Sequence, residues 1–170
     1  KQNNHKILVI RGKGNSFCTS GNIKKKDNNK EVPRKNTTEK INDLYKKQLE
    51  LTHALSALEI PTVAVITGPA AGAGLSLALA CDFRIGNNEA FFLSNYSKIG
   101  LTGDYGISWY LTNLLGPSKA KELMFCNHRI YADEAYKIGL LNFLFTKNFE
   151  RNLKSFLDNL LNQSNYALKL

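Results

Sequence analysis

Residues 60–82 read IPTVAVITGPAAGAGLSLALACD, and this stretch decides the fold. The β-branched run at 62–67 predicts a buried strand, the glycines with Pro69 predict a tight turn, and the small and apolar residues that follow predict a buried helix. No charged side chain occurs at 61–81, which has about the length of a membrane-spanning helix, but the glycines and Pro69 break it into pieces. We therefore expect a strand, a turn and a helix inside a folded core.

Strand and helix patterns alternate along the rest of the chain. A strand is expected at 6–11, and a helix capped by Thr37 or Thr38 is expected to run to about residue 58. The apolar face of that helix comprises Ile41, Leu44, Leu51, Leu55 and Leu58. Further strands are expected at 82–85, 90–93 and 140–145, and further helices at 105–115, 118–126, 132–138 and 149–161. The alternation favours an α/β sheet with helices packed against it.

Composition favours one soluble globular domain over residues 1–170. Hydrophobic residues make up 43% and charged residues 22%, which excludes a disordered chain. Cys18, Cys81 and Cys126 form no CxxC pair, so neither a disulfide framework nor a zinc site is supported, and a reducing, cytoplasmic location is expected. The chain opens on Lys1 without a signal peptide or a starting Met, as a piece of a longer protein would.

The net charge of +9 is concentrated in the first third of the chain. Residues 1–50 hold 13 Lys and Arg against 5 Asp and Glu, whereas residues 51–170 are nearly balanced, with 10 against 9. This asymmetry indicates a polyanionic partner, and a solvated lysine-rich loop is the alternative. The run at 24–26 has no interleaved aromatic residues, so a phosphate-bearing ligand is favoured over nucleic acid.

The turn at 68–75 is the segment that suits chemistry. Small residues let another group approach the main chain, and unpaired N–H groups at a helix start suit a phosphate or a developing oxyanion. No Lys-Ser or Lys-Thr follows the glycines, and the third glycine of the dinucleotide fingerprint is missing. Close helix packing explains the small residues equally well.

The whole of 60–82 resembles the signature of the enoyl-CoA hydratase/isomerase (crotonase) family. Residues 16–23, SFCTSGNI, resemble the family's first ligand loop, and residues 96–101 and 132–140 resemble later family segments in the same order. The family's usual first hairpin and last helices are missing from this resemblance. It implies a single domain with a crotonase-like ββα spiral core.

The resemblance also implies an activity. Family members bind an acyl-CoA or an acyl-carrier-protein thioester, need no cofactor beyond the CoA of the substrate, and assemble as homo-trimers or hexamers. Two main-chain N–H groups hold the thioester oxygen and stabilise an enolate, and by position these belong to Gly21 and Ala73.

The sequence departs from the hydratase pattern at two positions. Family hydratases use two Glu, and the matching positions here hold Ser76 and Tyr96. Residues 101–109 resemble the segment of the isomerase-like branch that places one acid at Asp104, so Asp104 is predicted to transfer the proton. One carboxylate suffices to move a double bond. Hydration, decarboxylation or non-catalytic thioester binding are the alternatives, and Asp104 would otherwise cap a helix beginning at Tyr105.

Several of the remaining candidate residues have two interpretations. Ser76 and Tyr96 are predicted to bind substrate, and packing is the alternative for both hydroxyls. Lys24 is predicted to meet the phosphates of CoA unless it belongs to a solvated run. Trp109 is expected in the core, and a place in the lining of the acyl pocket is the alternative. His5, His53 and His128 lack metal-ligand spacing, and Cys18 and Cys81 are assigned to packing.

Overall fold

The computed structural model describes residues 5–20 and 36–163, and a four-stranded parallel sheet forms its centre. The strands are β1 (Leu8–Arg11), β2 (Thr62–Ile66), β4 (Phe83–Gly86) and β7 (Phe143–Leu144), in the order β1-β2-β4-β7. A parallel sheet of this kind needs helices on both faces. The expected α/β class is confirmed.

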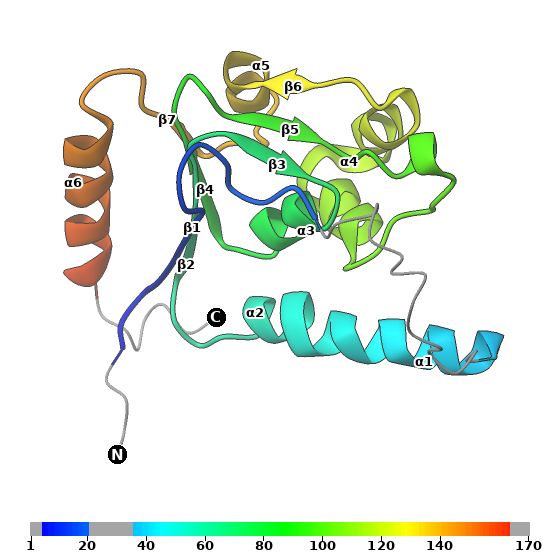
Figure 1. The fold of residues 1–170 in the computed structure, drawn as a ribbon. Coiled ribbons are helices and arrows are strands. Elements are labelled where there is room, and N and C mark those ends of the chain that lie inside the picture. Colours follow the sequence, from blue (N-terminus) through cyan, green and yellow to red (C-terminus); the bar gives the residue numbers. More distant parts are fainter. Residues whose placement is uncertain (1–4, 21–35, 164–170) are drawn as a thin grey trace.

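A smaller three-stranded sheet lies beside the parallel one (Figure 1). It contains β3 (Pro69–Ala71), β5 (Phe91–Leu93) and β6 (Ile130–Tyr131). Strand β3 pairs parallel with β5, and β5 pairs antiparallel with β6. The segment expected to be only a turn between β2 and the next helix therefore contains a strand, because Pro69 starts an extended segment whose partner comes from β5.

Six α-helices are described in residues 5–20 and 36–163. They are α1 (Thr37–Gln48), α2 (Ala54–Ser56), α3 (Ala73–Leu79), α4 (Ile107–Cys126), α5 (Ala132–Lys137) and α6 (Phe149–Leu161). A π-helical turn, η1 (Leu49–His53), joins α1 to α2, and a 3₁₀ turn, η2 (Ser97–Ile99), precedes α4. Helix α6 lies on one side of the parallel sheet and α3 on the other (Figure 1).

Strand β2 is buried along its whole length because helices cover both of its faces. Val63 and Val65 pack with Leu153 of α6, while Ala64 and Ile66 belong to the core that contains Leu75 of α3. Alternate side chains of one strand thus enter two different apolar clusters. The uncharged run is explained by burial from both sides.

The first helix corrects two expectations. Its N-cap is Asn36, whose side chain accepts the Glu39 N–H in a capping box, so neither Thr37 nor Thr38 caps it. Its expected apolar face is also mostly exposed: Leu55 is buried, but Ile41 is 61% exposed. Figure 1 shows the reason, since α1 extends beyond the sheets that would cover it.

The segment expected to hold helices at 105–115 and 118–126 forms α4 with a break inside it. Gly116 has φ 78° and ψ 162°, which interrupts the helix directly before Pro117. The helix begins at Ile107, later than expected, because Tyr105 and Gly106 both have positive φ. Within residues 5–20 and 36–163, no helix is both long and apolar enough to cross a membrane.

Candidate active site

A cavity of about 400 Å³ lies between the turn that enters α3 and the segment that leads from β5 to α4. Three residues predicted from the sequence line it: Ala73, Tyr96 and Asp104. Ser20 reaches the same cavity from the segment that follows β1, and Ile99 adds an apolar wall. Segments distant in the sequence thus bring an amide, a phenol and a carboxylate together.

Tyr96 and Asp104 form a hydrogen-bonded pair in this cavity. The Tyr96 hydroxyl donates to Oδ1 of Asp104, and Tyr96 is only 6% exposed. Burial, and next the hydrogen bond to Asp104, raise the pKa of Tyr96 well above its ordinary value. The phenol therefore keeps its proton at neutral pH and remains a donor to the carboxylate.

The main chain of Asp104 is fixed from two sides. Its carbonyl oxygen accepts the Ile107 N–H at 3.2 Å and the Ser76 hydroxyl at 3.1 Å. The Asp104 side chain makes no cap, because the N-cap of α4 is Gly106 and has no side-chain hydrogen bond. The alternative that Asp104 caps a helix from Tyr105 is therefore wrong.

Ala73 presents its N–H at the beginning of α3. This N–H donates to the Ser20 Oγ at 2.6 Å, and the Ser20 hydroxyl donates to the Ala71 carbonyl oxygen at 3.0 Å. Gly72, with φ 55°, supplies the turn that exposes the amide. Gly21 lies outside the described residues, so the expected pair of amides stays a prediction.

The two other predicted substrate contacts have different places. Ser76 is fully buried and is not among the residues that line the cavity, and its hydroxyl donates to the Asp104 carbonyl oxygen. Lys24 lies outside the described residues. Both assignments stay predictions.

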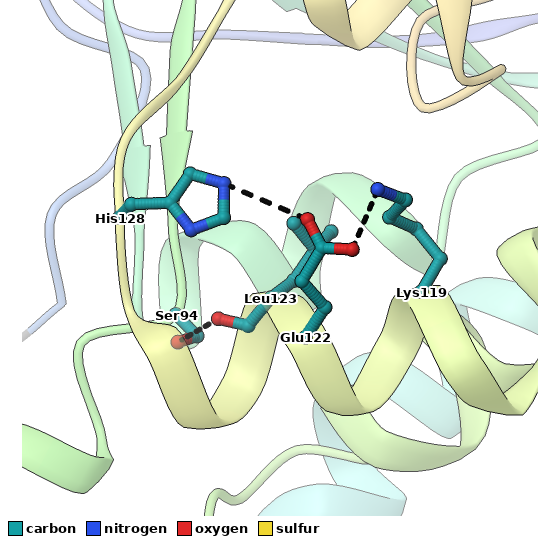
Figure 2. Close-up of polar contacts among 5 residues, drawn as sticks. All are labelled: Ser94, Lys119, Glu122, Leu123 and His128. Carbon is teal, nitrogen blue, oxygen red and sulfur yellow. Dashed lines mark hydrogen bonds and ion pairs between the residues drawn. The ribbon is translucent and has the colours of Figure 1, made fainter.

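Asn127 supports the cavity wall and was not singled out from the sequence. Its Oδ1 accepts the Asn95 N–H at 2.6 Å and lies 3.0 Å from the Ser94 Oγ. The Ser94 hydroxyl donates to the Leu123 carbonyl oxygen at 3.0 Å, as Figure 2 shows. Ser94 and Asn95 both line the cavity. Asn127 follows α4 with φ 53°, and an Asn one residue past an expected helix end is the signal that could have identified it.

Lys119 and Glu122 of α4 form a polar cluster with His128, which follows the helix, and this cluster lies outside the cavity lining. Figure 2 shows Glu122 between Lys119 and His128, with Nζ–Oε2 and Nε2–Oε1 distances of 2.7 and 3.9 Å. The hydrogen bond from Lys119 lowers the pKa of the Glu122 carboxyl. His128 is therefore a surface partner of a carboxylate.

Trp109, expected in the core, is 65% exposed, because it lies on the outer side of α4 and contacts Tyr110 edge-on.

Comparison with known proteins gives the family. The enoyl-CoA hydratase/isomerase family model matches residues 1–170. A 4-chlorobenzoyl coenzyme A dehalogenase of Arthrobacter sp. is 34% identical over 143 residues, which cover 82% of this chain and 50% of that protein. The enoyl-CoA isomerase/hydratase fer4 of Mycosarcoma maydis is 33% identical over 138 residues, which cover 81% of this chain and 48% of that protein.

Solved structures agree with these relatives. An enoyl-CoA hydratase from Polaromonas sp. JS666 superimposes with a TM-score of 0.84 at 31% identity, covering 99% of this chain and 65% of that one. The chain spans about half the length of the relatives it matches. The family match, the fold and the relatives together show that this chain belongs to the enoyl-CoA hydratase/isomerase family.

Proposed function

We propose that this chain moves a carbon–carbon double bond within an enoyl thioester. The observation that supports this most directly is that the Asp104 carboxylate and the Ala73 amide line one cavity. A base and an amide donor in one cavity are the two groups that an enolate mechanism requires.

The reaction needs one base and no added atoms. The Asp104 carboxylate removes a proton from the carbon next to the thioester carbonyl, and the electron pair of the broken C–H bond moves into the conjugated system. The resulting dienolate carries its negative charge on the thioester oxygen, where the Ala73 N–H and the predicted Gly21 N–H stabilise it. Protonated Asp104 then returns the proton to the γ carbon, and the double bond has moved by one position.

Other groups of the cavity fit this scheme. The Tyr96 hydroxyl fixes one oxygen of the Asp104 carboxylate. Among the described residues no hydrogen bond reaches the other oxygen, Oδ2, which is then free to accept the proton. Ile99 and Leu101 supply apolar surface for an acyl chain.

The test is an isomerase assay on a 3-enoyl-CoA, followed by the ultraviolet absorbance of the conjugated product. Replacing Asp104 by Asn should lower kcat by about 100- to 10,000-fold, the range that one acid–base group contributes. Asp158→Asn, an exposed acid on α6, is the matched control and should leave kcat unchanged. Equal rates for Asp104→Asn and the unmodified chain would remove Asp104 from the mechanism.

Assays with other thioester substrates distinguish the alternative reactions. Loss of 2-enoyl-CoA absorbance indicates hydration, carbon dioxide from a carboxylated acyl-CoA indicates decarboxylation, and chloride from 4-chlorobenzoyl-CoA indicates the reaction named for one relative. Turnover of none of these thioesters, together with a higher melting temperature in acyl-CoA, would support a binding module instead.

The basic first third of the chain supports CoA as the carrier, and Lys24 is part of this proposal. Lys24→Ala should raise KM for an acyl-CoA and leave KM unchanged for the same acyl group on N-acetylcysteamine, which has no phosphates.

A homo-trimer or hexamer is also proposed, supported by exposed apolar residues such as Ile41 and Tyr45. Light scattering of the purified chain measures the mass of the assembly and so checks the number of subunits.

A further inference from the structure

Ser20 stands in an unusual relation to the predicted substrate-binding amide. The Ala73 N–H donates to the Ser20 Oγ at 2.6 Å, close to the distance of about 2.7–3.1 Å at which such an amide holds an oxyanion. Ser20 also lines the cavity. A side-chain oxygen of the protein therefore stands at the acceptor position of this N–H.

The local backbone shows that this placement is specific. Ser20 has φ 71°, a left-handed conformation that a residue with a Cβ adopts only at a cost in strain. Its hydroxyl is held by a second hydrogen bond, to the Ala71 carbonyl oxygen at 3.0 Å. A Cβ added to Gly72 would lie 2.3 Å from the Ser20 Oγ, so the hydroxyl occupies space that Gly72 leaves open.

We propose that the Ser20 hydroxyl is an internal competitor of the substrate: it occupies the Ala73 N–H in the free protein, and a thioester carbonyl must displace it to bind. This inference rests on the proposed function, because it assigns Ala73 as the carbonyl donor. Displacement breaks two hydrogen bonds of Ser20 and forms one from Ala73 to the substrate. Residue 20 thus sets how strongly the cavity selects ligands that carry a carbonyl at this position.

Displacement of the Ser20 hydroxyl predicts different binding for two ligands that differ by one oxygen. Butyryl-CoA carries the thioester carbonyl, and S-butyl-CoA, a thioether, lacks it. Removing the Ser20 hydroxyl affects only the ligand whose oxygen takes its place. In the variant, water can solvate the freed Ala73 N–H, but the substrate carbonyl displaces that water without any rearrangement of the protein.

The experiment measures the Kd of both ligands by calorimetry for the unmodified chain, Ser20→Ala and Ser20→Gly. Both variants should bind butyryl-CoA about two- to tenfold more tightly, the factor that one net hydrogen bond represents, with no change for S-butyl-CoA. Ser20→Ala keeps the Cβ and its strain, whereas Ser20→Gly removes both, so agreement between them assigns the effect to the hydroxyl. Ser155→Ala, which removes an exposed hydroxyl on α6 away from this cavity lining, is the control and should change neither Kd.

A second readout needs no turnover and reports on Ala73 itself. In ¹⁵N–¹H spectra the Ala73 amide should exchange with solvent faster in both Ser20 variants, and melting curves establish that the variants are folded. Unchanged or weaker binding of butyryl-CoA in the folded variants, or an equal change for both ligands, overturns the inference alone. If the unmodified chain binds neither ligand, the proposed function fails and the inference fails with it.

Discussion

The hydroxyl of Tyr96 donates to the carboxylate of Asp104, and this bond joins the segment after β5 to the segment before α4. Tyr96 is almost fully buried, whereas Asp104 is only partly buried at the cavity. The tyrosine thus connects the core of the protein to its proposed base. We therefore expect Tyr96 to position this carboxylate.

Tyr96→Phe tests that role. The variant keeps the buried ring and removes the hydroxyl, so the chain should fold while Asp104 loses its hydrogen-bond donor. We expect kcat for the isomerase assay to fall by about 10- to 100-fold, the range that corresponds to one hydrogen bond to a charged group, with KM nearly unchanged. Tyr131→Phe, at a tyrosine that is 57% exposed, is the control and should match the unmodified chain. A rise in KM at constant kcat would instead assign Tyr96 to substrate binding.

Alkaline solution should destabilise the protein through Cys81. Burial raises the pKa of its thiol from 9.0 to about 12. Below pH 9 the thiol is protonated in both the folded and the unfolded chain. Between pH 9 and 12 only the unfolded chain loses the proton, so the free energy of unfolding falls as pH rises, by at most about 4 kcal/mol.

Denaturant titrations of Cys81→Ala and the unmodified chain across this pH range check the expectation. The variant should have a shallower decline, although its starting stability is lower because a small cavity replaces the sulfur. The raised pKa of Tyr96 acts in the same direction in both proteins. Cys126→Ala removes an exposed thiol and should keep the full decline; parallel curves for Cys81→Ala and the unmodified chain would refute the assignment.

Gly72→Ala should be strongly destabilising for two separable reasons. The φ of 55° disfavours any side chain, and the new Cβ would lie 2.3 Å from the Ser20 Oγ. We expect a loss of about 1–3 kcal/mol from the backbone conformation and a further loss from the collision. Gly139→Ala, where φ is 78° and no atom lies within 4 Å of the added Cβ, isolates the backbone effect.

A double variant separates the two causes further. Adding Ser20→Gly to Gly72→Ala removes the colliding hydroxyl, so the melting temperature should rise relative to Gly72→Ala alone and remain below that of the unmodified chain. If the changes in free energy of unfolding caused by the two single substitutions add up to that of the double variant, residues 20 and 72 are not in contact.

The sequence predicted what depends on local patterns. The β-branched and small residues of 60–82 specify β2 and α3, and the spacing of Phe149, Leu153 and Phe156 specifies α6, because each signal is contained in one element. Strand β3 was missed, since its extended form depends on pairing with β5, which is distant in sequence. Such pairing has no local signature.

The site was predicted in part for the same reason. Family segments pointed to Ala73, Tyr96 and Asp104, and the cavity brings these three together. The hydrogen bond from Tyr96 to Asp104 and the placement of Ser20 at the Ala73 N–H depend on how separate segments fold together, which no local pattern predicts. The alternative role of Asp104 as a helix cap is wrong because Tyr105 and Gly106 both have positive φ, so that α4 begins only at Ile107.

Asn127 offers the last test, because it holds the cavity wall without lining it. Its Oδ1 fixes the Asn95 N–H at 2.6 Å, its own backbone is left-handed at φ 53°, and its Nδ2 is buried with no hydrogen-bond partner among the described residues. Asn127→Gly keeps the backbone conformation favourable and removes the side chain, so Asn95 loses its acceptor. We expect a loss of about 1–3 kcal/mol in stability, the effect of an unsatisfied buried N–H, and a higher KM for the enoyl-CoA. Asn148→Gly, at a second left-handed asparagine with φ 49° before α6, is the matched control and should leave KM unchanged. An unaltered KM in Asn127→Gly would show that the wall formed by residues 94 and 95 keeps its position without Asn127.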